Sequence, residues 1–190
     1  AAPCGPGWRG VWAFERSTIR HPAKVALGPV ACRNMRGKEL ITGIHEAGFR
    51  LMQDNLQFLD VGSGALARCI AYRRTDGAGT PVVWLGGFKS DMQSTKAIAI
   101  DEWCRTHGRP MLRMDYMGHG ESSGDFRDGT ISLWAEDAAA FLEHVVREPA
   151  IIVGSSMGGW IALLIARRLH EAGKPGPAGL VLIAPASDFT

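Results

Sequence analysis

Two stretches of the chain hold a serine between glycines in the pattern G-x-S-x-G. Gly154-Ser-Ser-Met-Gly158 centres on Ser156, and Gly120-Glu-Ser-Ser-Gly124 centres on Ser122. Such a serine can act as a nucleophile when it lies in a sharp turn between a strand and a helix. Ser156 follows the apolar run 151–153 and precedes a helix-like segment, whereas Ser122 lies in a glycine-rich loop. We therefore predict Ser156 as the nucleophile and Ser122 as a hydroxyl that closes a loop; the competing interpretation makes Ser156 a helix N-cap.

A second glycine pair precedes Phe88, directly after the apolar run 82–85. Backbone N–H groups in such a loop can stabilise the negative charge that develops on a carbonyl oxygen during acyl transfer. We predict an oxyanion hole made by the N–H groups of Phe88 and Met157; the alternative is an ordinary loop with turn glycines. The glycines predicted to leave room for the elbow and the loop are Gly86, Gly87, Gly154 and Gly158.

The segment 115–122 follows the expected strand 111–114 and contains His119 between two glycines. A dinucleotide site would need a third glycine, an opening helix and a later acid, which are not all present. His119 could act as a base, but we expect it to be a loop residue near the substrate pocket.

Strand-like and helix-like segments alternate from residue 58 onward. The expected strands are 58–61, 68–72, 82–85, 111–114, 151–153 and 179–184. The expected helices are 94–107, 131–146 and 157–170. Because the later strands are continuously apolar, we predict an α/β fold with a mostly parallel sheet and helices on both faces. The carboxyl ends of such strands meet at one edge, where ligands bind.

Residues 1–51 differ from the rest of the chain, with 8 Lys/Arg against 3 Asp/Glu and no clear periodicity. Three hypotheses remain open for this segment: upstream sequence that does not belong to the protein, a basic targeting segment, or a genuine extension. The partial domain is expected at 52–190. The arginines are not clustered, so no nucleic-acid role is expected. We predict a cytoplasmic protein, or one of the mitochondrial matrix if the segment is a targeting sequence.

Four cysteines occur without a C-x-x-C pair, which argues against a zinc knuckle and favours free thiols. No apolar run approaches the roughly 18 to 20 residues that cross a bilayer, so no membrane span is expected. Neither a metal nor an organic cofactor is implied.

The order of these motifs resembles the α/β-hydrolase fold family. The resemblance covers 58–190 and rests on Gly86-Gly-Phe88, the string D-x-x-G-x-G-x-S over 115–122, and Gly154-Ser-Ser-Met-Gly-Gly-Trp160. The blocks that start at Gly87 and Gly154 are similar to one branch, which contains a mitochondrial palmitoyl-protein thioesterase that also cleaves acyl glucuronides, and its bacterial relatives. The resemblance implies a serine hydrolase that cleaves a thioester or carboxylic ester of a small molecule or an acylated protein.

The chain departs from the family pattern after its last predicted strand. In the family, the triad acid and histidine follow later strands, so both are expected beyond residue 190, together with the lid. The resemblance therefore implies a fragment that lacks its last strands and helices and is nearly inactive by itself, because a serine without a base is a weak nucleophile. The alternative is a non-catalytic binding protein of the same fold.

Overall fold

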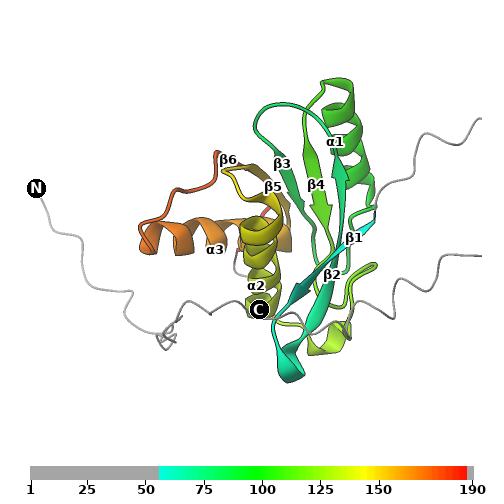
Figure 1. The fold of residues 1–190 in the computed structure, drawn as a ribbon, viewed down its shortest axis with the longest axis vertical. Helices are drawn as coiled ribbons and strands as arrows, with labels where there is room; N and C mark the ends of the chain where they lie inside the picture. The colour runs from blue at the N-terminus through cyan, green and yellow to red at the C-terminus, as the bar shows by residue number, and fades with distance from the viewer. Residues whose placement is uncertain (1–55, 188–190) are drawn as a thin grey trace, which may run out of the picture.

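The predicted apolar runs form the strands of a single sheet in the computed structural model, which describes residues 56–187 (Figure 1). The strands are β1 (Gln57–Val61), β2 (Arg68–Thr75), β3 (Val82–Leu85), β4 (Met111–Met114), β5 (Ile151–Ser155) and β6 (Gly179–Ile183). Their order in the sheet is β1-β2-β4-β3-β5-β6. The pairs β1–β2 and β2–β4 are antiparallel, whereas β4, β3, β5 and β6 run parallel to one another. The predicted, mostly parallel sheet is confirmed.

Three helices connect the parallel strands: α1 (Thr95–Thr106), α2 (Ile131–Phe141) and α3 (Met157–Glu171). The Thr130 hydroxyl caps α2 by accepting a hydrogen bond from the N–H of Leu133 at 3.2 Å. The sequence predicted one helix over 131–146, but the last turn, η4 (Leu142–Val146), is a π-helix. The Arg147 N–H closes this wider turn on the Leu142 carbonyl, and the left-handed backbone of Arg147 ends the helix.

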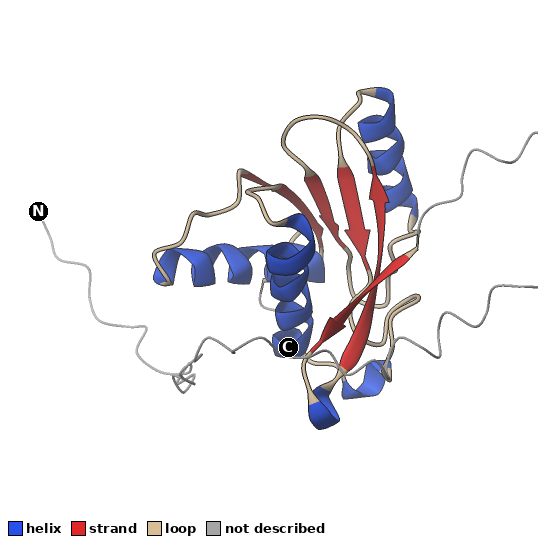
Figure 2. Ribbon diagram, viewed as in Figure 1, coloured by secondary structure: helices blue, strands red, loops and turns tan. Residues whose placement is uncertain are grey.

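The alternation of side chains along each strand builds a separate core on each face of the sheet. Val83 and Leu85 of β3 pack with α2 and α3, whereas Val82 and Trp84 of the same strand pack with α1. Figure 2 shows α1 on one side of the strands and α2 and α3 on the other. The helices that follow β3 and β5 therefore lie on opposite faces of the sheet.

The carboxyl ends of β3, β4 and β5 share one edge of the sheet because these strands are parallel. The loops that follow them carry the predicted loop glycines, His119 and Ser156 respectively. At one side of the sheet, β6 pairs with β5 alone, and its Leu180 and Val181 are 37% and 47% exposed.

Two smaller expectations met different outcomes. Cys104 is a buried free thiol, as predicted, but the prediction was wrong for Cys69, which is disulfide-bonded. The three interpretations of 1–51 concern residues that lie outside the described part of the chain. Within 56–187, no helix is long and apolar enough to cross a membrane.

Candidate active site

Ser156 is the single residue between the end of β5 and the start of α3, and its backbone is strained. Its φ of 53° and ψ of −117° lie in a region that residues with a side chain rarely occupy. Such strain persists only where the surroundings enforce it. The Ser156 N–H donates to the Ile183 carbonyl at 3.0 Å, and the Ser156 carbonyl accepts from Ala186 N–H at 3.2 Å. Ser156 therefore has the strand–turn–helix geometry that is typical of a nucleophile elbow.

Glycines on both sides of Ser156 allow the first turn of α3 to pack closely against the ends of the strands. A Cβ atom on Gly154 would lie 2.5 Å from the Gly158 carbonyl oxygen, and one on Gly158 would overlap the Leu85 carbonyl. A Cβ atom on Gly159 would lie 2.8 Å from Pro185. No side chain fits at these three positions without moving the backbone, so the sharp turn at Ser156 depends on them.

The turn after β3, residues 87–90, lies directly against Ser156. A Cβ atom on Gly87 would lie 3.4 Å from the Ser156 Cβ atom, and the Gly87 carbonyl accepts from the Ser90 N–H at 3.1 Å. Phe88 follows Gly87 and is 44% exposed. The structure thus brings the Gly87–Ser90 turn to the side chain that the sequence predicts as nucleophile.

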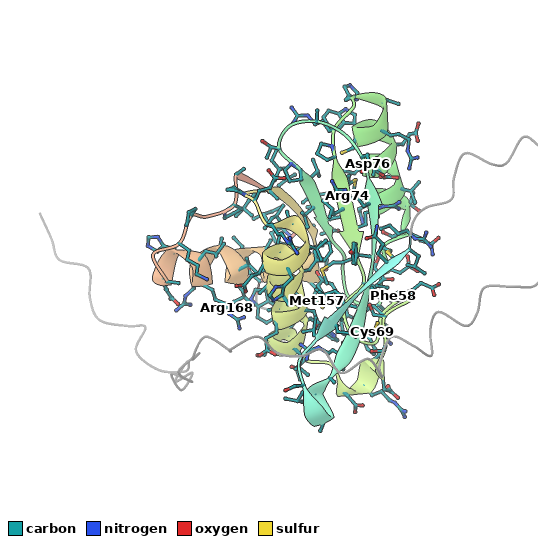
Figure 3. All side chains as sticks on the ribbon, viewed as in Figure 1. Phe58, Cys69, Arg74, Asp76, Met157 and Arg168 are labelled. Atoms are coloured by element: carbon teal, nitrogen blue, oxygen red, sulfur yellow. The ribbon has the colours of Figure 1, made fainter. Side chains whose placement is uncertain are left out.

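Met157 approaches the same side chain from the other direction, as the first residue of α3. The N–H groups in the first turn of a helix have no partner within that helix and carry partial positive charge. The Met157 side chain is fully buried, and Figure 3 shows it in the middle of the fold, whereas Arg168 lies near the outer end of α3. The amino end of α3 is therefore anchored in the core beside Ser156.

His119 is enclosed in the loop after β4 and makes no hydrogen bond to Ser156. Its ring is 4% exposed, and Nδ1 lies 3.1 Å from the Met117 carbonyl oxygen. Because a carbonyl only accepts, Nδ1 carries the proton, and burial lowers the pKa of the ring below its usual value. Within 56–187, no hydrogen bond joins the Ser156 hydroxyl to His119 or to any carboxylate.

Ser122, in the second G-x-S-x-G string, closes the loop that follows β4. Its hydroxyl donates to the Asp115 carbonyl at 2.6 Å and accepts from the Ala71 N–H at 2.8 Å. The Ser122 hydroxyl thus both donates and accepts a hydrogen bond within a loop, whereas Ser156 lies between β5 and α3.

Asp115 joins two loops at the edge of the sheet that carries Ser156. Its buried carboxylate accepts from the Met92 N–H at 2.6 Å and from the Glu121 N–H at 2.9 Å. Burial raises the pKa of this carboxyl to about 6, against the opposing effect of the two N–H groups. The same carboxylate fills the space beside Gly120, where no Cβ atom fits.

Two features near the site were missed from the sequence. Asp137 of α2 is fully buried, accepts from the Met117 N–H at 2.9 Å and forms an ion pair with Arg68. Burial raises the pKa of Asp137, while Met117 and Arg68 oppose the rise. The second feature is a group of aromatic rings from different elements around His119. The sequence does show Asp137 as an acid among apolar residues of α2, which could have indicated a buried ion pair. Nothing in the spacing of the sequence indicated the aromatic group around His119.

A cavity lies at the opposite edge of the sheet, lined by Arg74, Pro81, Pro110 and Glu148 among others. Pro81 and Pro110 precede β3 and β4, so this cavity is at the amino ends of the strands and away from Ser156. No group of three His, Cys, Asp or Glu side chains between residues 56 and 187 is arranged to hold a metal ion.

Comparison with known proteins matches residues 81–190 to the family model described as Serine aminopeptidase, S33. The chain belongs to this family of α/β-hydrolases. The match covers more than half of the chain and includes the loops after β3, β4 and β5. The predicted α/β-hydrolase fold is confirmed.

Individual relatives agree with the family. Mitochondrial palmitoyl-protein thioesterase ABHD10 from Mus musculus is 37% identical over 94 residues, 50% of this chain and 32% of that protein. The solved structure of alpha/beta hydrolase domain-containing protein 10 from mouse is 32% identical with a TM-score of 0.60, covering 68% of this chain and 50% of that one. A protein of Agrobacterium vitis S4 described as a hydrolase is 46% identical with a TM-score of 0.66, covering 71% and 54%. The chain therefore spans about a third of the curated relatives and about half of these solved chains, and the predicted likeness to the thioesterase branch is confirmed.

Proposed function

We propose that this chain carries the nucleophile half of a serine hydrolase that cleaves an acyl thioester or carboxylic ester through an acyl-serine intermediate. The observation that carries the proposal is the strained backbone of Ser156 at the β5–α3 junction, with Gly87 packed against it. Strain of this kind is retained where it serves to expose a reacting group.

In the first step, the Ser156 oxygen attacks the acyl carbon and its proton passes to a general base. The negative charge that forms on the carbonyl oxygen is stabilised by the N–H groups of Phe88 and Met157, and by the positive end of α3. The bond from the acyl carbon to the leaving sulfur or oxygen then breaks, and the leaving group takes the proton back. Water repeats the sequence on the acyl-serine and releases the acid.

The mechanism needs a general base, but no side chain within 56–187 is hydrogen-bonded to the Ser156 hydroxyl. His119 is a poor candidate because its unprotonated nitrogen, Nε2, is buried without a partner among the described residues and its ring is enclosed by aromatic side chains. We place the acid and the histidine of the triad in a part of the complete enzyme outside this sequence. Without them, the chain alone has little activity.

The substrate class follows from the relatives, at the level of the acyl bond. The mouse relative is named a palmitoyl-protein thioesterase, which favours thioesters of a protein or a small molecule. Attack by a serine uses the same groups for a thioester and an ester, so both remain within the proposal. The thioesterase relatives from Mus musculus and Bos taurus are named mitochondrial, which favours a mitochondrial location over the cytoplasm.

Labelling with a fluorophosphonate tests the proposal in the complete protein. The probe reacts with activated serines, so we expect it to label the wild type and to leave Ser156→Ala unlabelled. Ser122→Ala is the matched control, because Ser122 lies in the other G-x-S-x-G string, and it should still be labelled at Ser156. Labelling that persists in Ser156→Ala and vanishes in Ser122→Ala would contradict the assignment.

A further inference from the structure

The ring of Phe88 rests on aromatic side chains that come from other parts of the chain. We call this group the aromatic cluster; it consists of Phe88, Tyr116, His119, Phe126 and Trp134. The Phe88 ring lies 4.9 Å from the Phe126 ring at 71° and 6.1 Å from the Trp134 ring at 72°. Edge-to-face geometry at these centroid distances is the favourable arrangement of aromatic pairs. The Gly87–Ser90 turn is therefore braced by the 3-10 helix η3 (Phe126–Asp128) and by α2.

His119 is the centre of the aromatic cluster. Its ring lies 5.6 Å from Tyr116, 5.1 Å from Phe126 and 5.1 Å from Trp134, in each case close to edge-on. The Met117 carbonyl accepts from both His119 Nδ1, at 3.1 Å, and Trp134 Nε1, at 3.0 Å. The second ring nitrogen, Nε2, is buried without a partner among the described residues. His119 thus links the aromatic cluster to the backbone through the Met117 carbonyl. Two of the rings that it contacts, Phe126 and Trp134, also pack against Phe88.

The exposed side chain of Lys89 places its ammonium group over both the Phe88 and the Phe126 rings. Its Nζ atom lies 5.8 Å from the Phe88 centroid and 5.5 Å from the Phe126 centroid, within the range of cation–π attraction. The Lys89 backbone has a φ of 56°, a left-handed conformation that a non-glycine residue keeps only under constraint. The shared lysine indicates that the two rings hold the turn as a unit.

The position of the Phe88 ring bears on catalysis because the ring and the Phe88 N–H share one Cα atom. Groups that stabilise a transition state must be held within about 0.5 Å of their working position. We propose that Phe126 is a positioning residue for the reaction: its ring, carried by His119 and Trp134, keeps the Phe88 N–H aimed at the oxyanion. This inference rests on the proposed function, and Phe126 acts through Phe88 without touching the substrate.

The first test measures kcat and KM of the complete protein with p-nitrophenyl butyrate. Phe126→Leu keeps an apolar side chain but removes the ring, and we expect kcat to fall about tenfold while KM changes less than about twofold. This loss is smaller than the roughly 10²- to 10³-fold loss that follows removal of an entire oxyanion donor. Phe126→Tyr retains the ring and should restore kcat.

A double-mutant cycle separates positioning from general stability. Phe88→Leu removes the other ring of the pair, so it should lower kcat about as much as Phe126→Leu does. The double variant should be no slower than either single variant, whereas independent effects would multiply to about a hundredfold. The control is Leu142→Ala, which removes a partly buried side chain from the same core in η4 and should leave kcat unchanged.

An unchanged kcat in folded Phe126→Leu, or multiplied losses in the double variant, overturns the inference while leaving the proposed function intact. If Phe126→Leu does not fold, Phe88→Leu carries the test, because its side chain is 44% exposed; unchanged kcat there overturns the inference as well. Wild-type protein without activity, or activity that survives Ser156→Ala, refutes the proposed function and the inference with it.

Discussion

Asp115 makes the stability of the fold depend on pH in an unusual direction. Burial raises the pKa of its carboxyl from 3.8 to about 6 in the folded protein. Between those two values, the folded state binds more protons at this site than the unfolded state does. The free energy of unfolding therefore falls as the pH rises, since removing the proton is harder in the folded chain. A carboxylate held by an ion pair would behave in the opposite way.

The magnitude follows from the size of the pKa change. At about 1.4 kcal/mol per pH unit, the change costs the folded state about 3 kcal/mol at pH 7 relative to a pH well below 3.8, and about 2.4 kcal/mol of this cost arises between pH 4 and pH 7. Asp115→Asn has nearly the same shape and cannot ionise, so it escapes this cost. We expect the variant to gain about 2.4 kcal/mol relative to the wild type between pH 4 and pH 7, whatever its stability at pH 4.

Urea unfolding of the complete protein and of Asp115→Asn at pH 4, 5, 6 and 7 measures this difference. Comparing the two proteins at each pH cancels the contribution of other buried acids such as Asp137, whose pKa is raised in the same direction. A difference that stays constant with pH would show that Asp115 has an ordinary pKa. If the wild type instead gains stability relative to Asp115→Asn as the pH rises, the N–H groups of Met92 and Glu121 outweigh burial and lower the pKa of Asp115.

Three further outcomes are expected. Ser156→Gly should be more stable than Ser156→Ala by about 1 kcal/mol in urea unfolding, because only glycine relieves the left-handed backbone; equal stability would contradict the strain. Deleting residues 1–51 should leave the esterase activity of the complete protein within a few-fold, and a loss of soluble expression would show instead that the segment packs on the fold. The 190-residue chain should hydrolyse a short acyl thioester far more slowly than the complete protein; full activity that disappears in His119→Ala would make His119 the base.

The sequence predicted the parts of the structure that depend on local pattern. The strands of the sheet and the junction at Ser156 follow from apolar runs and from glycines at fixed offsets. The two G-x-S-x-G strings were separated by the strand before Ser156, and the hydrogen bonds of Ser122 agree with that distinction.

The missed features are those that depend on contacts between distant segments. Phe126 looked like one apolar residue in a polar loop, and its contact with Phe88 arises only when the loops after β3 and β4 meet. Asp137 finds its partner Arg68 across 69 positions of the chain. Spacing along the chain carries no information on such pairs, because they depend on the order of strands in the sheet.

The backbone partners of Ser156 also constrain when its geometry can form during translation. Its N–H is bonded to Ile183 and its carbonyl to Ala186, and Pro185 packs where Gly159 leaves room. All of these residues leave the ribosome after the serine does. A nascent chain that ends before Ala186 lacks the contacts that enforce the left-handed turn, so its serine relaxes to an ordinary backbone conformation. The strained turn at Ser156 can therefore form only after β6 and the residues through Ala186 have been synthesised.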